Sequence, residues 1–145
     1  MSSDRHPAVE KALQEALGNA EAKKHSTLDC LHVAAVLFRD KAAARLLDAA
    51  GADRARVCSE LDAAVRALPV CDPPPEDTPV SGGLGKALRA ASTLKRERNA
   101  AQVTVEHLLV ALADNPAVGR TLGRAGVAEG ALARAAESLR SSRPA

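Results

Sequence analysis

The chain has 145 residues, of which 46% are hydrophobic and 26% are charged, and its formal net charge at pH 7 is +2. This length allows one domain with a hydrophobic core of its own. No apolar run approaches the roughly 18 residues that a membrane-spanning helix needs. The numbers therefore exclude an integral membrane protein of the helical type and favour a single globular domain, residues 1–145.

The apolar residues are mostly alanine, leucine and valine, Phe38 is the only aromatic residue, and Trp and Tyr are absent. Alanine and leucine are strong helix formers, whereas aromatic residues favour strands. We therefore expect an all-α fold of about eight helices. The missing aromatic side chains also argue against a protein that stacks on single-stranded nucleic acid.

The charge is unevenly spread along the chain. Residues 1–68 hold ten basic and ten acidic side chains, residues 69–83 hold three acidic and no basic ones, and residues 84–145 hold ten basic and five acidic ones. A basic second half is compatible with nucleic-acid binding, which would depend strongly on salt. We favour a solvated helical surface and expect no nucleic-acid partner.

The three cysteines, Cys30, Cys58 and Cys71, are an odd number without paired spacing. This pattern predicts neither a disulfide framework nor a zinc motif. Cys30 and Cys58 lie in apolar stretches and are expected to be buried, whereas Cys71 is expected to be an exposed thiol. With no secretory leader at the start of the chain, we expect a soluble, cytoplasmic protein.

The first half of the chain predicts four helices within residues 8–68. Val9 begins an apolar stripe at helical spacing that predicts the first helix. Thr27 is the expected N-cap of a second helix, which begins at Leu28 and is so apolar that it must be buried. The other boundaries are an Asp40 cap and Gly51 for the third helix, and an Asp53 cap and Pro69 for the fourth.

Residues 69–83 contain five of the eight prolines, including the triplet Pro73-Pro74-Pro75. Proline triplets favour an extended polyproline conformation. We therefore predict an extended, acidic linker here.

The second half repeats this plan within residues 84–140. Leu84 begins the stripe of the first helix, with Leu94 on its flank. Thr104 is expected to cap a second apolar helix that begins at Val105. Asn115-Pro116 predicts the start of the third helix and Gly126 its end. The last helix is expected over residues 128–139.

The two halves therefore form a tandem repeat, and we expect them to be related by a pseudo-twofold axis. Lys11-Ala12-Leu13 recurs as Lys86-Ala87-Leu88, at an offset of 75 in the numbering. The alignment of Thr27 with Thr104 gives an offset of 77, and that of Gly51 with Gly126 gives 75 again. In this alignment His32 and His107 occupy positions that are not equivalent.

No catalytic or metal-binding set emerges from the spacing of reactive residues. Gly82-Gly83-Leu84-Gly85-Lys86 lacks the spacing and the preceding strand of a Walker loop. His32 and His107 lie without the three or four converging ligands of a metal site. We expect both to be core or helix-end histidines, and we expect no enzyme activity in this chain.

Several motifs together resemble the N-terminal Clp repeat domain of ClpB/Hsp100 chaperones, particularly the eukaryotic cytosolic ones. They are Thr104-x-Glu106-His107-Leu108-Leu109 followed by Ala125-Gly126-Val127, the earlier Leu31-His32-Val33, and the proline-rich join after Leu68. The resemblance covers about residues 5–140. Cys30 and Asn99-Ala100 depart from the family pattern, which has proline and Gly-Asp there.

The resemblance implies a module that binds unfolded or aggregated client proteins through a shallow apolar groove. Its residues, carried over by position, are Ala90, Leu94, Glu106 and His107. Glu106 is equally explained as an acidic residue that stabilises a helix start. Ala90 and His107 replace larger apolar residues of the family, which implies a less apolar groove.

The family also implies partners and cofactors outside this chain. ATP and Mg²⁺ would belong to two ATPase domains of a hexameric ring, possible adaptor proteins would be further partners, and the isolated domain would be a monomer without a cofactor. The alternative is a free-standing accessory protein that binds the Clp protease or an adaptor. The ending Ser141-Ser142-Arg143-Pro144-Ala145 resembles the start of a linker and favours a domain of a longer protein.

Overall fold

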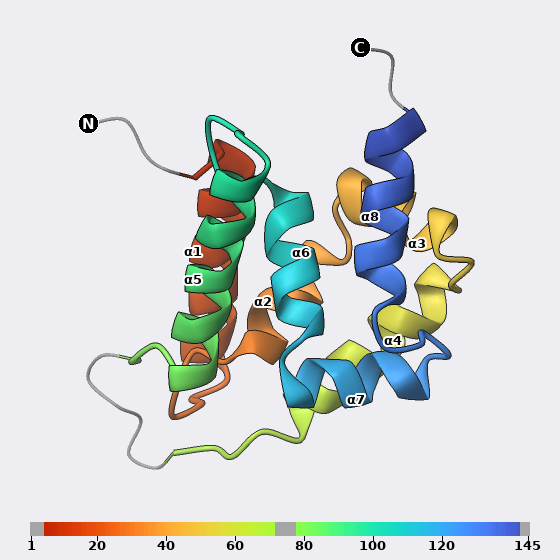
Figure 1. The fold of residues 1–145 in the computed structure, drawn as a ribbon. Helices are drawn as coiled ribbons and strands as arrows, with labels where there is room; N and C mark the ends of the chain where they lie inside the picture. Colours follow the sequence, from red (N-terminus) through yellow and green to blue (C-terminus); the bar gives the residue numbers. More distant parts are fainter. Residues whose placement is uncertain (1–4, 72–77, 143–145) are drawn as a thin grey trace.

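The fold is all-α, as predicted. The structure is a computed structural model that describes the backbone of residues 5–71 and 78–142 and the side chains of residues 5–71 and 78–139. The described residues form eight helices (Figure 1). They are α1 Pro7–Ala22, α2 Cys30–Leu37, α3 Lys41–Ala49, α4 Arg54–Arg66, α5 Gly82–Glu97, α6 Val105–Ala113, α7 Pro116–Arg124 and α8 Ala131–Ser142.

Most helix boundaries follow from local signals in the sequence. The side chains of Asp40, Asp53 and Asn115 accept hydrogen bonds from backbone N–H groups in the first turns of α3, α4 and α7, as predicted. Gly51 and Gly126 follow α3 and α7 with φ of 74° and 88°. This left-handed conformation is the one in which glycine ends a helix at little steric cost.

The start of α2 corrects the prediction at Thr27. Asp29 is the N-cap, and its carboxylate accepts a hydrogen bond of 3.0 Å from the N–H of Leu31. Leu28, the expected first helical residue, instead lies in extended backbone and donates its N–H to the carbonyl of Pro79 at 2.8 Å. A contact that is distant in sequence therefore delays the helix by two residues.

This shift also corrects the register between the repeats. The numbers of the N-caps Asp29 and Thr104 differ by 75, and the first residues of α1, α2 and α3 precede those of α5, α6 and α7 by the same offset. His32 and His107 therefore occupy equivalent positions, contrary to the prediction. The offset of 77 was wrong because it aligned two threonines instead of the two helix caps.

The last helix begins later than predicted, at Ala131. Gly130 precedes it with φ of 76°, a left-handed conformation that is incompatible with the interior of a right-handed helix. The chain therefore passes through a turn between α7 and α8 (Figure 1).

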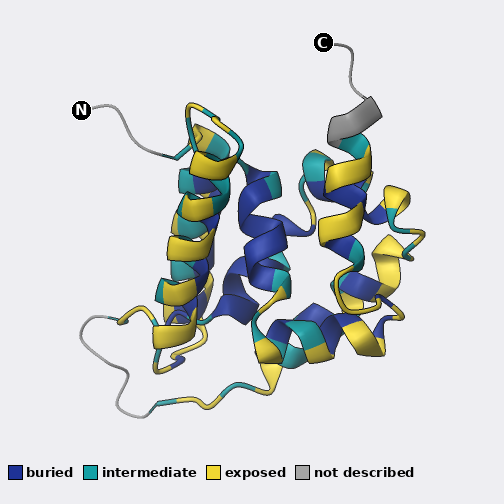
Figure 2. Cartoon of the chain, viewed as in Figure 1, coloured by how far each residue is buried: buried dark blue, intermediate teal, exposed yellow. Residues whose placement is uncertain are grey.

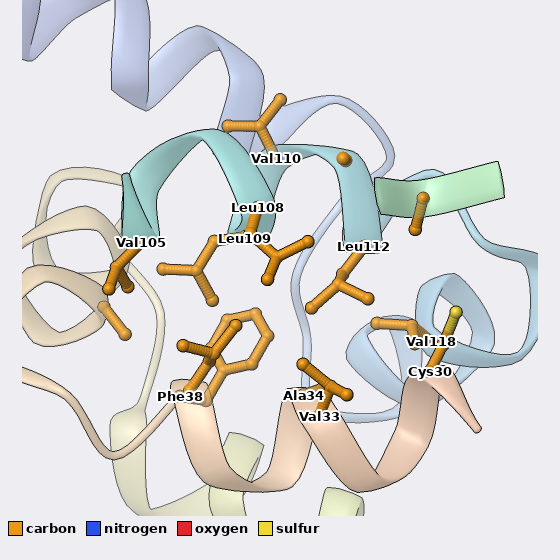
Figure 3. Packing of buried hydrophobic residues seen from close by; sticks show 14 of the residues in the cluster. Cys30, Val33, Ala34, Phe38, Val105, Leu108, Leu109, Val110, Leu112 and Val118 are labelled. Carbon is orange, nitrogen blue, oxygen red and sulfur yellow. The ribbon is translucent and has the colours of Figure 1, made fainter. Parts of the chain in front are cut away.

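The two short central helices, α2 and α6, are surrounded by the other helices, as predicted (Figures 1 and 2). Each repeat also packs onto the other, since α3 contacts α8 and α4 contacts α7. The side chains of α2 and α6 meet in the core, where Phe38 lies near Leu109 (Figure 3). Phe38, Leu108 and Leu109 are all buried.

Two isolated bridges hold the segments before the helices together. Arg5 pairs with Val103, and Leu28 pairs with Val80. At the repeat offset of 75, Arg5 corresponds to Val80 and Val103 corresponds to Leu28. Each bridge therefore corresponds to the other with the two repeats exchanged, which is the relation that a pseudo-twofold axis produces. A third bridge joins His25 to Val70.

The predicted linker is therefore attached to the domain at both ends. The N–H of Cys71 donates to the carbonyl of Lys24 at 2.7 Å, and the N–H of Ser81 donates to the carbonyl of Leu28 at 3.0 Å. Helix α5 already begins at Gly82, two residues before its predicted start at Leu84. Residues 72–77, with the proline triplet, lie outside the described residues.

The conformation at Gly51 gives a prediction with an internal control. A Cβ atom at Gly51 or at Gly18, which lies within α1, would meet no heavy atom within 4 Å apart from those of its chain neighbours and of the nearby α1 backbone. We expect Gly51→Ala to lower the free energy of unfolding by about 1–2 kcal/mol because its φ of 74° is left-handed. Gly18→Ala should raise it by about 0.5–1 kcal/mol, because alanine is the better helix former.

Urea denaturation of both variants measures the two changes. Stabilisation by both substitutions would contradict the left-handed assignment at Gly51.

Candidate functional site

The two central helices begin with the same device, in which a histidine takes the place of the usual glutamate of a capping box. The Nδ1 atom of His32 accepts the N–H of Asp29 at 2.9 Å, and that of His107 accepts the N–H of Thr104 at 3.0 Å. The threonine side chain in turn accepts the N–H of His107 at 3.4 Å. These hydrogen bonds confirm that both histidines serve helix starts, and both rings are buried.

The four predicted client-binding residues lie on two adjacent helices, α5 and α6. Ala90 is exposed on α5, and Leu94, one turn later, is partly buried against the core. Glu106 lies in the first turn of α6 and is partly exposed. His107 is only 8% exposed, so its ring contributes to the surface chiefly by shaping the turn that carries Glu106.

Glu106 lines a hollow of about 290 Å³ at the meeting point of several helix ends. Its apolar lining comes from α1, α3, α6 and α8, and polar residues accompany it. The lining residues are His6, Ala8, Asp40, Ala42, Arg45, Thr104, Val105, Glu106 and Leu139. Ala90, Leu94 and His107 are not among them, so Glu106 is the only one of the four predicted residues in the lining given for this hollow.

Burial lowers the pKa of His107. Desolvation of the ring is the main cause, the charge of Glu106 acts in the opposite direction, and Arg98 adds to the lowering. The ring is therefore held neutral, with Nδ1 as a hydrogen-bond acceptor. The neutral ring can accept the hydrogen bond from the N–H of Thr104, which a positively charged ring could not.

A larger hollow of about 670 Å³, which the sequence analysis missed, lies between the end of α6, α7 and the start of α8. The apolar residues that line it include Val110, Leu122 and Leu132.

At the corrected register, two small residues that line this hollow correspond to larger residues of the first repeat. Phe38 is replaced by Ala113, and Asp48 is replaced by Gly123. In the first repeat Asp48 lies 3.5 Å from Arg54 in an ion pair, which Gly123 cannot form. In an alignment of the two repeats, small residues of the second repeat opposite larger residues of the first would have been the sequence signal for this hollow.

The three thiols are free, and their burial differs in part from the prediction. Cys30 is buried as expected, whereas Cys58 and Cys71 are both partly exposed. Burial, followed by the nearby charge of Asp29, raises the pKa of the Cys30 thiol to about 12. Cys30 is therefore a protonated core residue and not a reactive thiolate.

The described residues contain no group of three or more His, Cys, Asp or Glu side chains placed to hold a metal ion. None of the described helices combines the length and the apolar character that crossing a membrane requires. The glycine-rich stretch that superficially resembles a phosphate loop forms the first turn of α5, starting at Gly82. A Walker loop precedes its helix as a loop after a strand, so this local structure differs from it.

Curated relatives match most of this chain. It is 27% identical over 136 residues to heat shock protein 104 of Schizosaccharomyces pombe, which covers 90% of the chain and 15% of that protein. It is 29% identical over 123 residues to chaperone protein ClpB 1 of Parasynechococcus marenigrum, covering 83% of the chain and 14% of that protein. The chain thus spans about 15% of the length of these relatives.

Solved structures share the fold. The Hsp104 N-terminal domain from Candida albicans superposes with a TM-score of 0.89 at 22% identity, covering 97% of this chain and 94% of that one. The N-terminal domain of ClpD from Arabidopsis thaliana gives a TM-score of 0.72 at 17% identity, covering 96% of each chain.

The sequence pattern of one family settles the relationship. The Clp repeat (R) N-terminal domain matches residues 6–125, which is most of the chain. The protein therefore belongs to the Clp repeat N-terminal domain family, and its relatives are chaperones of the Hsp104 and ClpB type.

Proposed function

We propose that this domain binds exposed apolar stretches of unfolded or aggregated proteins and presents them to an Hsp100-type ATPase ring in the cytoplasm. The observation that carries the proposal is the hollow at Glu106, where apolar side chains from four helices are bordered by polar ones. Its volume of about 290 Å³ holds one or two side chains and not a folded partner.

Such a site suits weak and unselective binding. A small apolar hollow with few polar contacts distinguishes poorly between partners, which is what a broad range of clients requires. Tethering to a ring would compensate for the weak affinity by raising the local concentration of the client. Ala90 and Leu94 extend the proposed surface along α5, and His107 holds the turn that carries Glu106.

The alternative is an accessory domain without an ATPase of its own, which binds the Clp protease or an adaptor. The curated relatives are about seven times longer than the part that this chain matches, and this favours the first proposal. The natural length of the protein in a cell extract, measured by immunoblotting, distinguishes the two. A band at the size of this domain would favour the accessory role.

Titration of the domain with dephosphorylated casein tests client binding. We expect amide chemical-shift changes around Glu106 and along α5 at high client concentration. Glu106→Gln should weaken binding several-fold, while lowering the free energy of unfolding only by the roughly 0.3–1 kcal/mol of a helix-dipole contact. The corresponding fall in Tm is a few degrees.

Glu15→Gln is the matched control, because Glu15 is an exposed acid on α1 that does not line the hollow at Glu106. It should leave client binding unchanged. No shift changes at millimolar client would refute the proposal. Equal binding by Glu106→Gln and the unaltered domain would mean that Glu106 serves only the helix start.

A further inference from the structure

A third hollow, polar and of about 320 Å³, lies in the first repeat and has His32 of the capping box in its lining. Residues of three helices, or just beyond their ends, line it. Asn19 lies in α1 and Lys23 just after its end, His32 lies in α2 and Arg39 follows it. Helix α4 supplies Asp62 and Arg66. Apolar side chains from α2 and α4 complete the lining.

The charged groups of this hollow are unbalanced. Three cations, Lys23, Arg39 and Arg66, line it together with one carboxylate, that of Asp62. Arg39 is paired with Asp62 at 2.5 Å, whereas Lys23 and Arg66 form no ion pair within the described part of the chain. Among the described residues, no carboxylate therefore pairs with these two positive charges.

The equivalent position in the second repeat holds an ion pair. At the repeat offset, Lys23 corresponds to Arg98 and Asp62 to Glu137, and these two form an ion pair of 2.8 Å. The other two cations have no basic counterpart, because Arg39 corresponds to Asp114 and Arg66 to Ser141. The excess of cations is thus a property of the first repeat alone.

The charge of Lys23 also acts on two buried histidines, His25 and His32. Burial is the main cause that lowers the pKa of both His25 and His32, and the charge of Lys23 lowers both further. Asp29 acts in the opposite direction on His32.

We propose that this hollow binds a phosphate group through Lys23, Arg39, Arg66 and Asn19. An ammonium, two guanidinium groups and an amide supply only N–H donors toward a phosphate, and Arg39 keeps donors that its pairing with Asp62 does not use. The volume accommodates a phosphate with several waters, or a phosphorylated side chain. The proposal is independent of the client site at Glu106, which lies in another hollow.

Lys23 and Arg66 have a second possible role, because they lie at the ends of α1 and α4, where a cation compensates the helix dipole. That role stabilises the fold without any ligand. Binding measurements on variants that keep the fold separate the two roles.

The test is isothermal titration of the domain with inorganic phosphate and with a short phosphoserine peptide, alongside the same peptide without phosphate. We expect saturable binding that weakens with added NaCl, with amide shift changes at Lys23 and Arg39. Binding of both phosphate compounds assigns the site to the phosphate group itself. Binding of the phosphopeptide alone assigns it to phosphorylated polypeptides.

Two variants with opposite expected effects on phosphate binding make the test more specific. The double variant Lys23→Gln/Arg66→Gln should weaken phosphate binding at least about tenfold, the order of effect of one lost charge-assisted contact. Asp62→Asn should strengthen binding, since it removes the only carboxylate that lines the described part of the hollow. Lys86→Gln/Arg120→Gln removes the same charge from exposed positions of the second repeat and should change nothing.

Three results would overturn the proposal. They are no binding of either phosphate compound, equal binding of the peptide with and without its phosphate, and equal losses in the Lys23/Arg66 and Lys86/Arg120 double variants. Melting curves of every variant show whether it is folded, so a loss of binding in an unfolded variant is not counted as support.

Discussion

Leu108→Ala should lower the free energy of unfolding by about 2–5 kcal/mol, the usual cost of deleting a buried leucine side chain beyond Cβ. Leu108 is fully buried in α6, and α6 contacts both its own repeat and the α2 helix of the other (Figure 3). A cavity there removes contacts on both sides of the interface between the repeats. Urea denaturation followed by circular dichroism measures the change.

Two control variants test whether the loss of stability in Leu108→Ala comes from removing a buried side chain. Leu108→Met nearly conserves the volume and should cost less than about 1.5 kcal/mol. Val70→Ala removes methyl groups from a side chain that is 65% exposed and should stay within about 0.5 kcal/mol of the unaltered domain. A denaturation midpoint that Leu108→Ala leaves unchanged would contradict the central position of α6.

The helices were predictable from the sequence because their signals are local. Asp40, Asp53 and Asn115 cap helices through hydrogen bonds to residues two or three positions away, and Gly51 and Gly126 end helices through their own φ angles. A cap or a left-handed glycine needs no distant partner. The all-α class and the burial of α2 and α6 follow from composition and periodicity in the same way.

The start of α2 was not predictable in this way, because a distant segment decides it. Thr27 and Asp29 are both acceptable caps, and only the hydrogen bonds of Leu28 with Pro79 and Ser81 exclude the earlier one. These bonds join residues more than fifty positions apart. The error in the register of the repeats, and with it the missed equivalence of His32 and His107, followed from this single choice.

The candidate site was predictable only in part for a similar reason. Glu106 was placed in a first helical turn correctly, since the Thr104 cap is local. Its hollow is completed by α1, α3 and α8, which no spacing within α5 and α6 reveals. The hydrogen bond between His25 and His32 also depends on the loop between α1 and α2, where Lys24 has a left-handed φ of 57°.

Acidification should destabilise the domain through the pair of His25 and His32. The Nδ1 atom of His25 lies 2.6 Å from the Nε2 atom of His32, and both rings are buried. Because the N–H of Asp29 donates to Nδ1 of His32, the neutral His32 carries its proton on Nε2 and donates it to His25. A further proton on either ring would place two donors face to face, at Asp29 or between the rings.

The direction of the pH dependence follows from the lowered pKa of both histidines. The charged groups around the pair are Lys23, Asp29, Arg39, Asp62 and Arg66. In the unfolded chain each histidine binds a proton as the pH falls through about 6.5, while in the folded domain each stays neutral to lower pH. The free energy of unfolding should therefore be fully retained above about pH 7.5 and decrease as the pH falls below about 6.5.

At about pH 5.5 this loss should reach up to about 1.4 kcal/mol for each histidine that remains neutral in the folded domain. His32→Gln should reduce the pH dependence, because glutamine can still accept the N–H of Asp29 but does not titrate. His6→Asn removes an exposed histidine outside the pair and keeps a capping side chain on α1, so it serves as the control variant. Urea midpoints of the three proteins between pH 5.5 and 7.5 give the comparison, and parallel curves for His32→Gln and the unaltered domain would show that the histidine pair does not resist protonation.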